Sequence, residues 1–319
     1  MANRTVMKTL GLDEIIDAGT AKELKEVYEK DIQEPLERHI PLQPGKLART
    51  RDLLSRVVSG SGEWRDILEK INNTGQTVLL RLEHKDTGIL NLPWGLADDP
   101  FTGKALAEQR RLVIAKNVTG YFGPELPDFP APPLKLLIMV SSPMDLDPVH
   151  ALLKYEEEEK HILNAFSPLI EAGLVQIDFT PDASLQSLEE KLTHSHYHIL
   201  HFTGHGYVRT RKNGDKEEVE GVLVMENRDT LKRENVSALD FAEILCSPQV
   251  KQVPMVILSA CQTAAGGGDG MGGVTRQLMR AGVPAVISMS MSVRDDMAAQ
   301  FAAALYRGMA QRMTVFTAF

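Results

Sequence analysis

The sequence has few cysteines and no long apolar run, and each of these deficits excludes a class of protein. Only Cys246 and Cys261 occur in 319 residues. Two cysteines make no disulfide framework, which favours a reducing, cytoplasmic setting. No segment reaches the roughly 18 apolar residues that a membrane span needs. The first residues, MANRTVMKTLGLDEII, lack the apolar core and cleavage site of a signal peptide. We therefore expect a cytoplasmic protein with no membrane partner.

An excess of positive charge is lacking as well. The formal net charge is −8, and the lysines and arginines are spread along the chain. This distribution argues against a dedicated nucleic-acid surface, so no direct nucleic-acid site is expected. Hydrophobic residues make up 43% and charged residues 24% of the chain, as in an ordinary soluble globular protein. The length suits about two domains.

The first part of the chain predicts helices followed by short strands. Residues 1–75 mix charged and apolar residues at helical spacing, so we expect a helical N-terminal region there. Residues 76–122 form a predicted small β-rich region packed on the core, with strands at TVLLRLEH, ILNLPWGL and RRLVIAKNVTGYF. Residues 123–133 hold five prolines and predict an extended linker.

From residue 134 to residue 319 strands and helices alternate. This pattern predicts an α/β fold with a mostly parallel sheet covered by helices on both faces. We expect EEVEGVLVMEN to form a hairpin-like pair and VSALDFAEILC to form a helix. The last residues, RMTVFTAF, resemble the start of a further helix, and we expect the natural chain to continue. The predicted strands are LKLLIMVSSP, LVQIDFT, HYHILHFTGHG, VPMVILSAC and VPAVISM.

A glycine-rich segment offers one possible function. Residues 268–273 fit the pattern G-x-G-x-x-G of dinucleotide sites, and Asp295 lies downstream. In such sites the first glycine directly follows the first strand of the sheet. Here nine residues, Ser259 to Gly267, separate the apolar run from Gly268, and the strand comes late in the chain. A nucleotide-binding α/β domain is therefore the less favoured alternative, and no cofactor is expected.

A cysteine and a histidine offer a second possible function. Cys261 comes just past the predicted strand VPMVILS, and His205 just past HYHILHFTG. The carboxyl ends of parallel strands meet at one edge of a sheet, where functional groups gather. A thiolate nucleophile paired with an imidazole fits this placement. The backbone N–H groups of Gly206 and Cys261 are candidate oxyanion donors. The alternative is a small buried cysteine and a turn histidine.

Several motifs together carry a family resemblance. They are HFTGHG (201–206), LSACQTA (258–264), GVTRQLMRAGVPAVISM (273–289), VRDDMAAQFAAALYRGMA (293–310) and, upstream, LPWGL (92–96). In this order and spacing, over residues 77–319, the chain resembles the CHAT domain of caspase- and separase-like cysteine proteases, which are mostly bacterial. The caspase motif Q-A-C-[RQG]-G is kept only in its centre, because Ser259 and Thr263 replace its outer residues.

The resemblance implies a function and a partner. It implies that His205 and Cys261 form a catalytic dyad that cleaves a protein substrate, with Gly206 binding the oxyanion. It further implies a role in bacterial defence or cell death and activation by a partner or a fused sensor or repeat domain. A catalytically silent interaction module is the alternative, and the presence of both dyad residues argues against it.

The specificity of such a protease is weakly marked in the sequence. The resemblance implies a pocket built from the loop after the first strand, the position two before the cysteine, and the loop after the next strand. Those places offer Asp145 and Asp147, Ser259, and Asp295 with Asp296. The acids favour a basic residue before the cut. Asp295 and Asp296 equally suit the N-terminus of the helix that follows, and this alternative stays open.

The histidines of HSHYHILHFTGH invite a metal hypothesis. On a strand, His194, His196 and His198 would face one way, and His201 and His205 the other. No second ligand group with metal spacing accompanies them, so no metal is expected. We further predict that residues 264–272 are mobile in the resting protein and become ordered when substrate or an activator binds.

Overall fold

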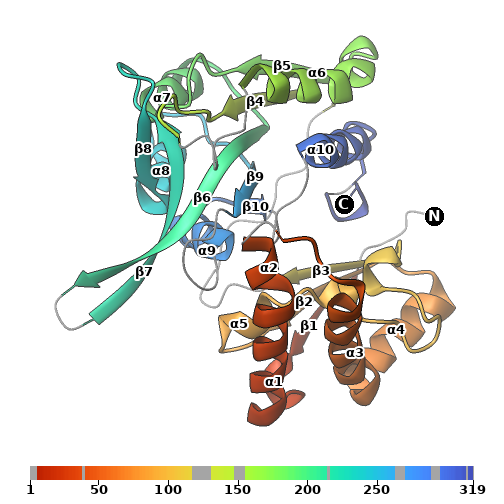
Figure 1. Cartoon of the computed structure of the whole chain (residues 1–319). Coiled ribbons are helices and arrows are strands. Elements are labelled where there is room, and N and C mark those ends of the chain that lie inside the picture. The colour runs from red at the N-terminus through yellow and green to blue at the C-terminus, as the bar shows by residue number, and fades with distance from the viewer. Residues whose placement is uncertain are drawn as a thin grey trace. The chain divides into compact units, whose positions relative to one another are not determined.

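The computed structural model describes residues 6–37, 40–116, 131–146, 155–213, 216–262, 270–288, 295–313 and 315–318. The chain divides into two compact units, Met1–Thr119 and Gly120–Ala318, called here the N-terminal and C-terminal units (Figure 1). Most of the predicted linker, 123–133, lies outside the described residues. None of the described helices is long and apolar enough to cross a membrane.

The N-terminal unit is built on a small parallel sheet. Its strands β1 (Val6–Gly11), β2 (Val78–Glu83) and β3 (Leu112–Lys116) lie in the order β1-β2-β3. The helices are α1 (Ala18–Tyr28), which continues through a π-helical turn (Glu29–Gln33) into α2 (Glu34–Glu37), then α3 (Pro44–Gly60), α4 (Gly62–Thr74) and α5 (Thr87–Leu90). Short 3-10 turns cover Leu12–Glu14, Trp94–Leu96 and Leu106–Glu108.

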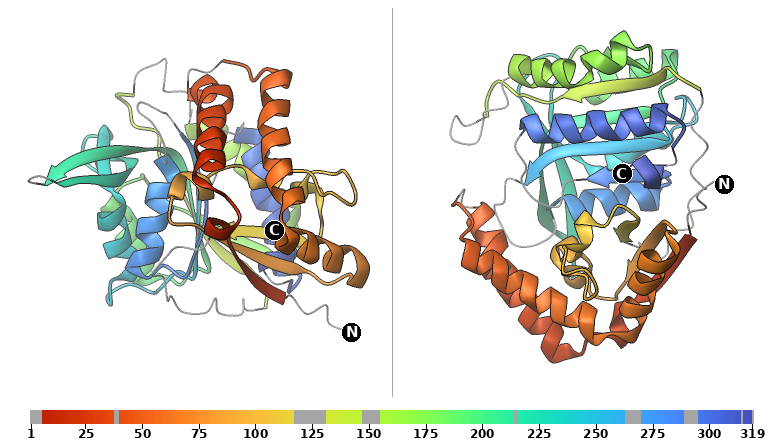
Figure 2. Two further views of the ribbon diagram at one scale, coloured as in Figure 1. Left: turned by 90° about the horizontal axis from the view of Figure 1, so that it is seen from below. Right: turned by 90° about the vertical axis from the view of Figure 1, so that its right-hand side faces the viewer.

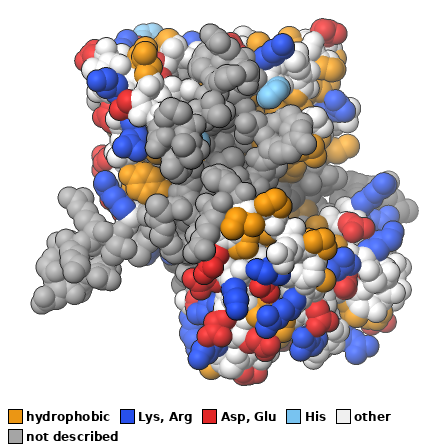
Figure 3. Space-filling model, in the orientation of Figure 1, with side chains coloured by type: hydrophobic (Ala, Val, Ile, Leu, Met, Phe, Trp, Pro, Cys, Tyr) orange, Lys and Arg blue, Asp and Glu red, His pale blue; other side chains and the backbone are white. Residues whose placement is uncertain are grey.

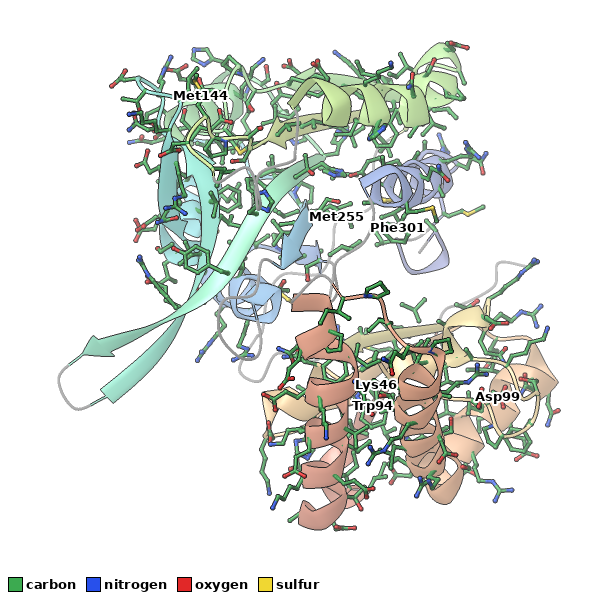
Figure 4. All side chains as sticks on the ribbon, viewed as in Figure 1. Lys46, Trp94, Asp99, Met144, Met255 and Phe301 are labelled. Carbon is green, nitrogen blue, oxygen red and sulfur yellow. The ribbon has the colours of Figure 1, made fainter. Side chains whose placement is uncertain are left out.

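Two tryptophans mark the core of this unit. Trp64 is fully buried, and its ring stacks on that of Trp94 with centroids 6.3 Å apart. The Trp94 indole donates to the carbonyl of Ile89 at 2.9 Å, so the polar tip of this ring is satisfied inside the core. Figure 4 labels Trp94 within the N-terminal unit. Ser61 caps α4 by accepting from the Trp64 amide at 3.3 Å, which fixes where the tryptophan enters the core.

The N-terminal unit differs from the prediction in two respects. Its first strand, β1, comes from residues 6–11, which were placed in a helical region, so residues before and after 75 share one sheet. Of the six β1 positions only Leu10 is buried, which explains why the sequence gives no strand signal there. The segment ILNLPWGL forms α5 and a 3-10 turn instead of a strand. Pro93 cannot donate to a sheet ladder, which disfavours a strand there.

The surface of the N-terminal unit carries charges of both signs. On the face drawn in Figure 3, Lys and Arg side chains are interspersed with Asp and Glu side chains. Some charged side chains of this unit pair along a helix, as Arg56 does with Asp52 at 2.7 Å. Exposed pairs of this kind add at most a few tenths of a kcal/mol each, about 0.3–0.5. This unit is therefore held together by its apolar core rather than by its surface charges.

The C-terminal unit confirms the predicted mostly parallel sheet. Its parallel strands lie in the order β10-β9-β6-β4-β5. Two antiparallel strands extend the sheet, because β7 pairs with β6 and β8 pairs with β7. The strands are β4 (Leu134–Val140), β5 (Val175–Phe179), β6 (Ile199–Asn213), β7 (Lys216–Glu226), β8 (Arg233–Ser237), β9 (Met255–Gln262) and β10 (Ala285–Ser288).

Helices cover both faces of this sheet, as the sequence predicted (Figure 2). Leu200 and Leu258 belong to the core shared with α7, α8 and α9. Ile199 and Met255 belong to the opposite core, shared with α6 and α10. Strand alternation thus assigns each position of β6 and β9 to one face. The helices are α6 (Tyr155–Glu171), α7 (Leu185–His194), α8 (Ala238–Cys246), α9 (Gly270–Ala281), α10 (Asp295–Ala310) and α11 (Val315–Ala318).

The β6–β7 hairpin is the main departure from the predicted elements of this unit. Strand β6 does not end at Gly206 but continues to Asn213, and 217–226 is one strand paired with it rather than a hairpin of its own. The sequence in the turn region, RTRKNGDKEEVE, is polar on both faces and gives no burial signal. Strand β8 was also missed; helix α8 begins only after it, where the Ser237 hydroxyl accepts from the Asp240 amide at 3.0 Å.

Candidate active site

His205 and Cys261 lie side by side on neighbouring strands. In the parallel pairing of β6 with β9, the Cα atom of His205 is the register partner of that of Cys261. Neighbouring strands are about 4.8 Å apart, and register partners in a parallel pair occupy the same face. The sequence predicts both residues just past the strand ends. In the structure both lie within their strands. The pairing nevertheless brings the two predicted dyad positions together.

The pair lies at the carboxyl edge of the parallel sheet. As far as the structure describes them, β10 pairs up to Leu258 of β9 and β4 up to Thr203 of β6, and both β6 and β9 continue beyond these positions. From β4 the chain first adds β5 on one side and then β6 on the other. Such a reversal of strand order creates a switch point, where open α/β sheets bind ligands. The odd-numbered positions 201, 203 and 205 share the α6 and α10 face, and His205 is buried there.

A hydrogen-bond network fixes the backbone around this edge. The buried Ser141 hydroxyl donates to the carbonyl of Val224 at 2.8 Å, and Val224 is the β7 partner of His205. The buried Glu226 carboxylate accepts from the amides of Ser142 at 2.7 Å and Ala183 at 3.1 Å. These bonds tie the end of β4 to β7 beside His205. No sequence pattern predicts this network, although Ser141 and Ser142 directly follow a buried strand.

The predicted pocket residues occupy different settings. Ser259 is half-buried on β9, opposite Thr203 and two residues before Cys261. The Asp145 carboxylate accepts from the Arg233 amide at 2.6 Å, so it holds the start of β8 against the loop after β4. Asp295 and Asp296 form the first turn of α10, where acids suit the helix dipole. Asp147 lies outside the described residues.

A second histidine lies deeper on the same face. His201 is buried, and its Nδ1 hydrogen-bonds the hydroxyl of Tyr306 on α10 at 2.8 Å. Burial lowers the pKa of His201 to about 4 and raises the pKa of Tyr306 well above its usual value. Both groups are therefore neutral near pH 7. The neutral pair connects β6, four residues before His205, to helix α10.

This buried histidine predicts a pH dependence of stability. In the unfolded chain His201 takes up a proton below about pH 6.5, whereas in the folded chain it stays neutral until about pH 4. The contribution of neutral His201 to stability is thus fully present above pH 6.5 and is lost as the pH falls towards 4. From pH 7 to pH 5 this single group lowers the free energy of unfolding by about 2 kcal/mol.

Urea unfolding at the two pH values checks this prediction. The wild type and His201→Gln are compared, because the difference between their pH dependences cancels the other titrating groups. The variant is expected to be less stable at pH 7 and to lose about 2 kcal/mol less on acidification. Equal losses for the two proteins would contradict a neutral, buried His201.

Two further histidines of the segment HSHYHILHFTGH, His198 and His194, have structural partners. The Nδ1 of His198 accepts from the Lys135 amide at 2.9 Å, and burial lowers the pKa of this imidazole. His194 hydrogen-bonds the carbonyl of Glu190 within α7. Within the described ranges, no three side chains of His, Cys, Asp or Glu come together as a possible metal site. Helix α9 begins at Gly270, within the glycine pattern, whereas Gly268 and most of the segment predicted to be mobile lie outside the described residues.

Comparison with models of protein families shows the family to which the chain belongs. The model of the CHAT domain family matches residues 64–319, about four fifths of the sequence. The chain belongs to the CHAT domain family. The CHAT match starts at Trp64 in α4, so it includes β2 and β3 of the N-terminal unit as well as the whole C-terminal unit. A search of curated proteins gave no match. The mixed α/β architecture of this CHAT protein, with its mostly parallel sheet flanked by helices, agrees with a caspase-like fold.

Proposed function

We propose that the protein is a cysteine endopeptidase whose catalytic dyad is His205 and Cys261. The observation that supports this most is the register of β6 and β9, which puts the two residues side by side at the carboxyl edge of the sheet. Membership of a caspase-like protease family supports the same reading. The residue types at this edge and the family thus favour the same chemistry.

The proposed reaction proceeds in two stages. The Cys261 thiolate attacks the peptide carbonyl carbon, a C–S bond forms, and the carbonyl oxygen becomes an oxyanion. When the C–N bond breaks, the leaving amine takes a proton from the His205 imidazolium and a thioester remains. His205 then takes a proton from water as the water attacks the thioester. The carboxylic acid product leaves, and the Cys261 thiolate is restored.

The oxyanion would be stabilised by backbone N–H groups. Gly206 and Cys261 are the proposed donors, because Gly206 has no side chain to block a substrate and both lie next to the proposed reacting atoms. For the pocket that receives the residue before the cut, Ser259 is the best-placed candidate. Asp145 and Asp295 remain weaker candidates. The Asp145 carboxylate already holds the start of β8, and Asp295 is the first residue of α10. We propose no metal and no cofactor.

The wider role follows only from the family. We propose that the protein cleaves a protein substrate in the cytoplasm, that a regulatory partner or a fused sensor or repeat domain activates it, and that it acts in bacterial defence or cell-death signalling. The alternative is a catalytically silent CHAT module that binds a partner. Both alternatives share a fold, so only a measurement at Cys261 separates them.

Labelling with a thiol-reactive activity probe near pH 7 tests the proposal. We expect the wild type to be labelled at one cysteine, and Cys261→Ala and His205→Ala to lose the label. Cys246→Ala is the matched control. Cys246 ends helix α8 at the surface, and partial burial raises the pKa of its thiol, so its loss should leave the labelling unchanged. Equal labelling with and without His205 would exclude the dyad, and no labelling of Cys261 would favour the silent module.

A further inference from the structure

The β6–β7 hairpin carries a two-stranded extension, the ribbon (Figure 1). Its β6 part begins at residue 207, two residues after His205. Within the described residues, β6 pairs with β9 up to Gly206, and β7 pairs with β8 from Val222 onwards. Between these limits residues 207–213 and 216–221 pair with each other. Among the residues that the structure describes, no strand continues β9 alongside 207–213. An edge with unpaired backbone groups can accept a further strand.

This edge is in line with the proposed nucleophile. Cys261 is opposite His205, so a strand added beside 207–213 would continue the line of β9. At about 3.4 Å per residue, a position opposite Arg209 is about 14 Å beyond the position of Cys261, and one opposite Arg211 about 20 Å. An extended chain along this edge therefore reaches the dyad within four to six of its own residues, as the register counts them.

Charge is unevenly divided between the two strands of the ribbon. Arg209, Arg211 and Lys212 lie on β6, whereas their register partners Glu220, Glu218 and Glu217 lie on β7. One pair is formed directly, with Arg209 Nε 2.6 Å from Glu220 Oε2. A strand added to the β6 edge would be one strand spacing from the cations and two from the acids. Cross-strand neighbours of opposite charge stabilise a sheet and like charges destabilise it.

We infer that the β6 edge of the ribbon, residues 207–213, binds an acidic extended segment of a protein substrate. The charges select an acidic strand, and they disfavour a second copy of β6, whose cations would face these. Antiparallel pairing is the more stable kind, and it would bring the chain from the tip of the ribbon towards Cys261. The acids would then precede the cut by about four to seven residues. This position rests on the proposed function, whereas the binding edge does not.

Peptide binding to the Cys261→Ala full-length protein tests the inference without cleavage. Two fluorescent extended peptides are compared by anisotropy, one alternating Glu with Thr and Val, the other with Lys in place of Glu. A third peptide has the Glu sequence with alternate backbone amides N-methylated. We expect the Glu peptide to bind at least about tenfold tighter than the Lys peptide. The methylated peptide should bind as weakly as the Lys peptide, because it cannot extend the sheet.

A charge-swapped ribbon is the decisive variant. Exchanging R211E, K212E, E217K and E218K keeps both cross-strand pairs and the net charge of the ribbon, but it makes the β6 edge acidic. We expect the peptide preference to reverse, with the Lys peptide at least about tenfold tighter. The matched control is Lys104→Glu with Glu108→Lys, an exchange at exposed positions of the N-terminal unit, which should leave the preference within about twofold.

Three outcomes would overturn the inference. An unchanged preference in the swapped protein would show that the charges only hold the ribbon together. Equal binding of the methylated peptide would mean simple surface attraction, and self-association without peptide binding would point to a second copy of this chain. If the peptides bind as expected but the thiol probe does not label Cys261, the edge stands and the proposed peptidase function fails.

Discussion

Cys261→Ala is expected to lower kcat/KM for a cleaved substrate by about 10⁴-fold or more, because the proposed nucleophile is removed outright. His205→Ala should cost a similar factor. Residues that act as a unit are strongly non-additive, so the double variant should be hardly slower than either single one. Both variants should keep the wild-type unfolding midpoint within a few degrees, since Cys261 is the last but one residue of β9 and His205 carries no large apolar side chain.

The measurement is single-turnover cleavage of an identified substrate, with Cys246→Ala as the matched control that retains activity. Losses that multiply in the double variant would contradict a dyad and indicate two independent roles. A loss with Cys261→Ala alone would keep the nucleophile but reject His205 as its partner. The expected pattern is specific, because a merely structural role would appear in the unfolding midpoint as well.

Gly221→Val is expected to have the second large effect, on stability and on the position of α9. A Cβ atom at Gly221 would be 2.6 Å from the Val274 backbone nitrogen and 2.7 Å from its Cγ2. Real Cβ atoms do not approach backbone so closely, and the Gly221 amide also donates to Gln277 Oε1 at 3.1 Å. Helix α9 must therefore shift away from β7, which should cost about 1–3 kcal/mol or more.

The helix displaced by Gly221→Val is the one that follows β9 and Cys261 in the chain. We therefore expect activity to fall together with stability, measured as kcat/KM and as the urea midpoint. Gly60→Ala is the control, because a Cβ atom there meets nothing within 4 Å and alanine suits a helix. Its stability should be unchanged or higher. A Gly221→Val protein as stable and active as the wild type would show that α9 adjusts freely.

The main sheet could be predicted because its strands are buried on both faces. Segments such as LKLLIMV and VPMVILS are almost wholly apolar, and helices with apolar stripes alternate with them. The proposed dyad could be predicted as a juxtaposition for the same reason, since parallel strands place their carboxyl ends together. The exact register of His205 on Cys261 could not be predicted, because it depends on how far both strands extend.

The features that escaped prediction depend on partners distant in sequence. The residues of β1 are mostly exposed before Leu10, so pairing with β2, not burial, makes this segment a strand. The far half of β6 is polar on both faces and is held by cross-strand partners. Glu226 and Ser142 are 84 positions apart, and no local sequence pattern predicts their hydrogen bond. These are the contacts that shape the surroundings of the proposed site.

The most direct test of the central claim is the rate of alkylation of Cys261 by iodoacetamide at pH 7, followed by mass spectrometry in a Cys246→Ala background. If His205 forms an ion pair with the thiolate, the wild-type dyad should react at least about tenfold faster than the His205→Ala variant, because an imidazolium beside the thiol increases its thiolate fraction. The difference should vanish above about pH 9, where a free thiol ionises by itself. Equal rates at pH 7 would contradict the dyad and, with it, the proposed peptidase mechanism.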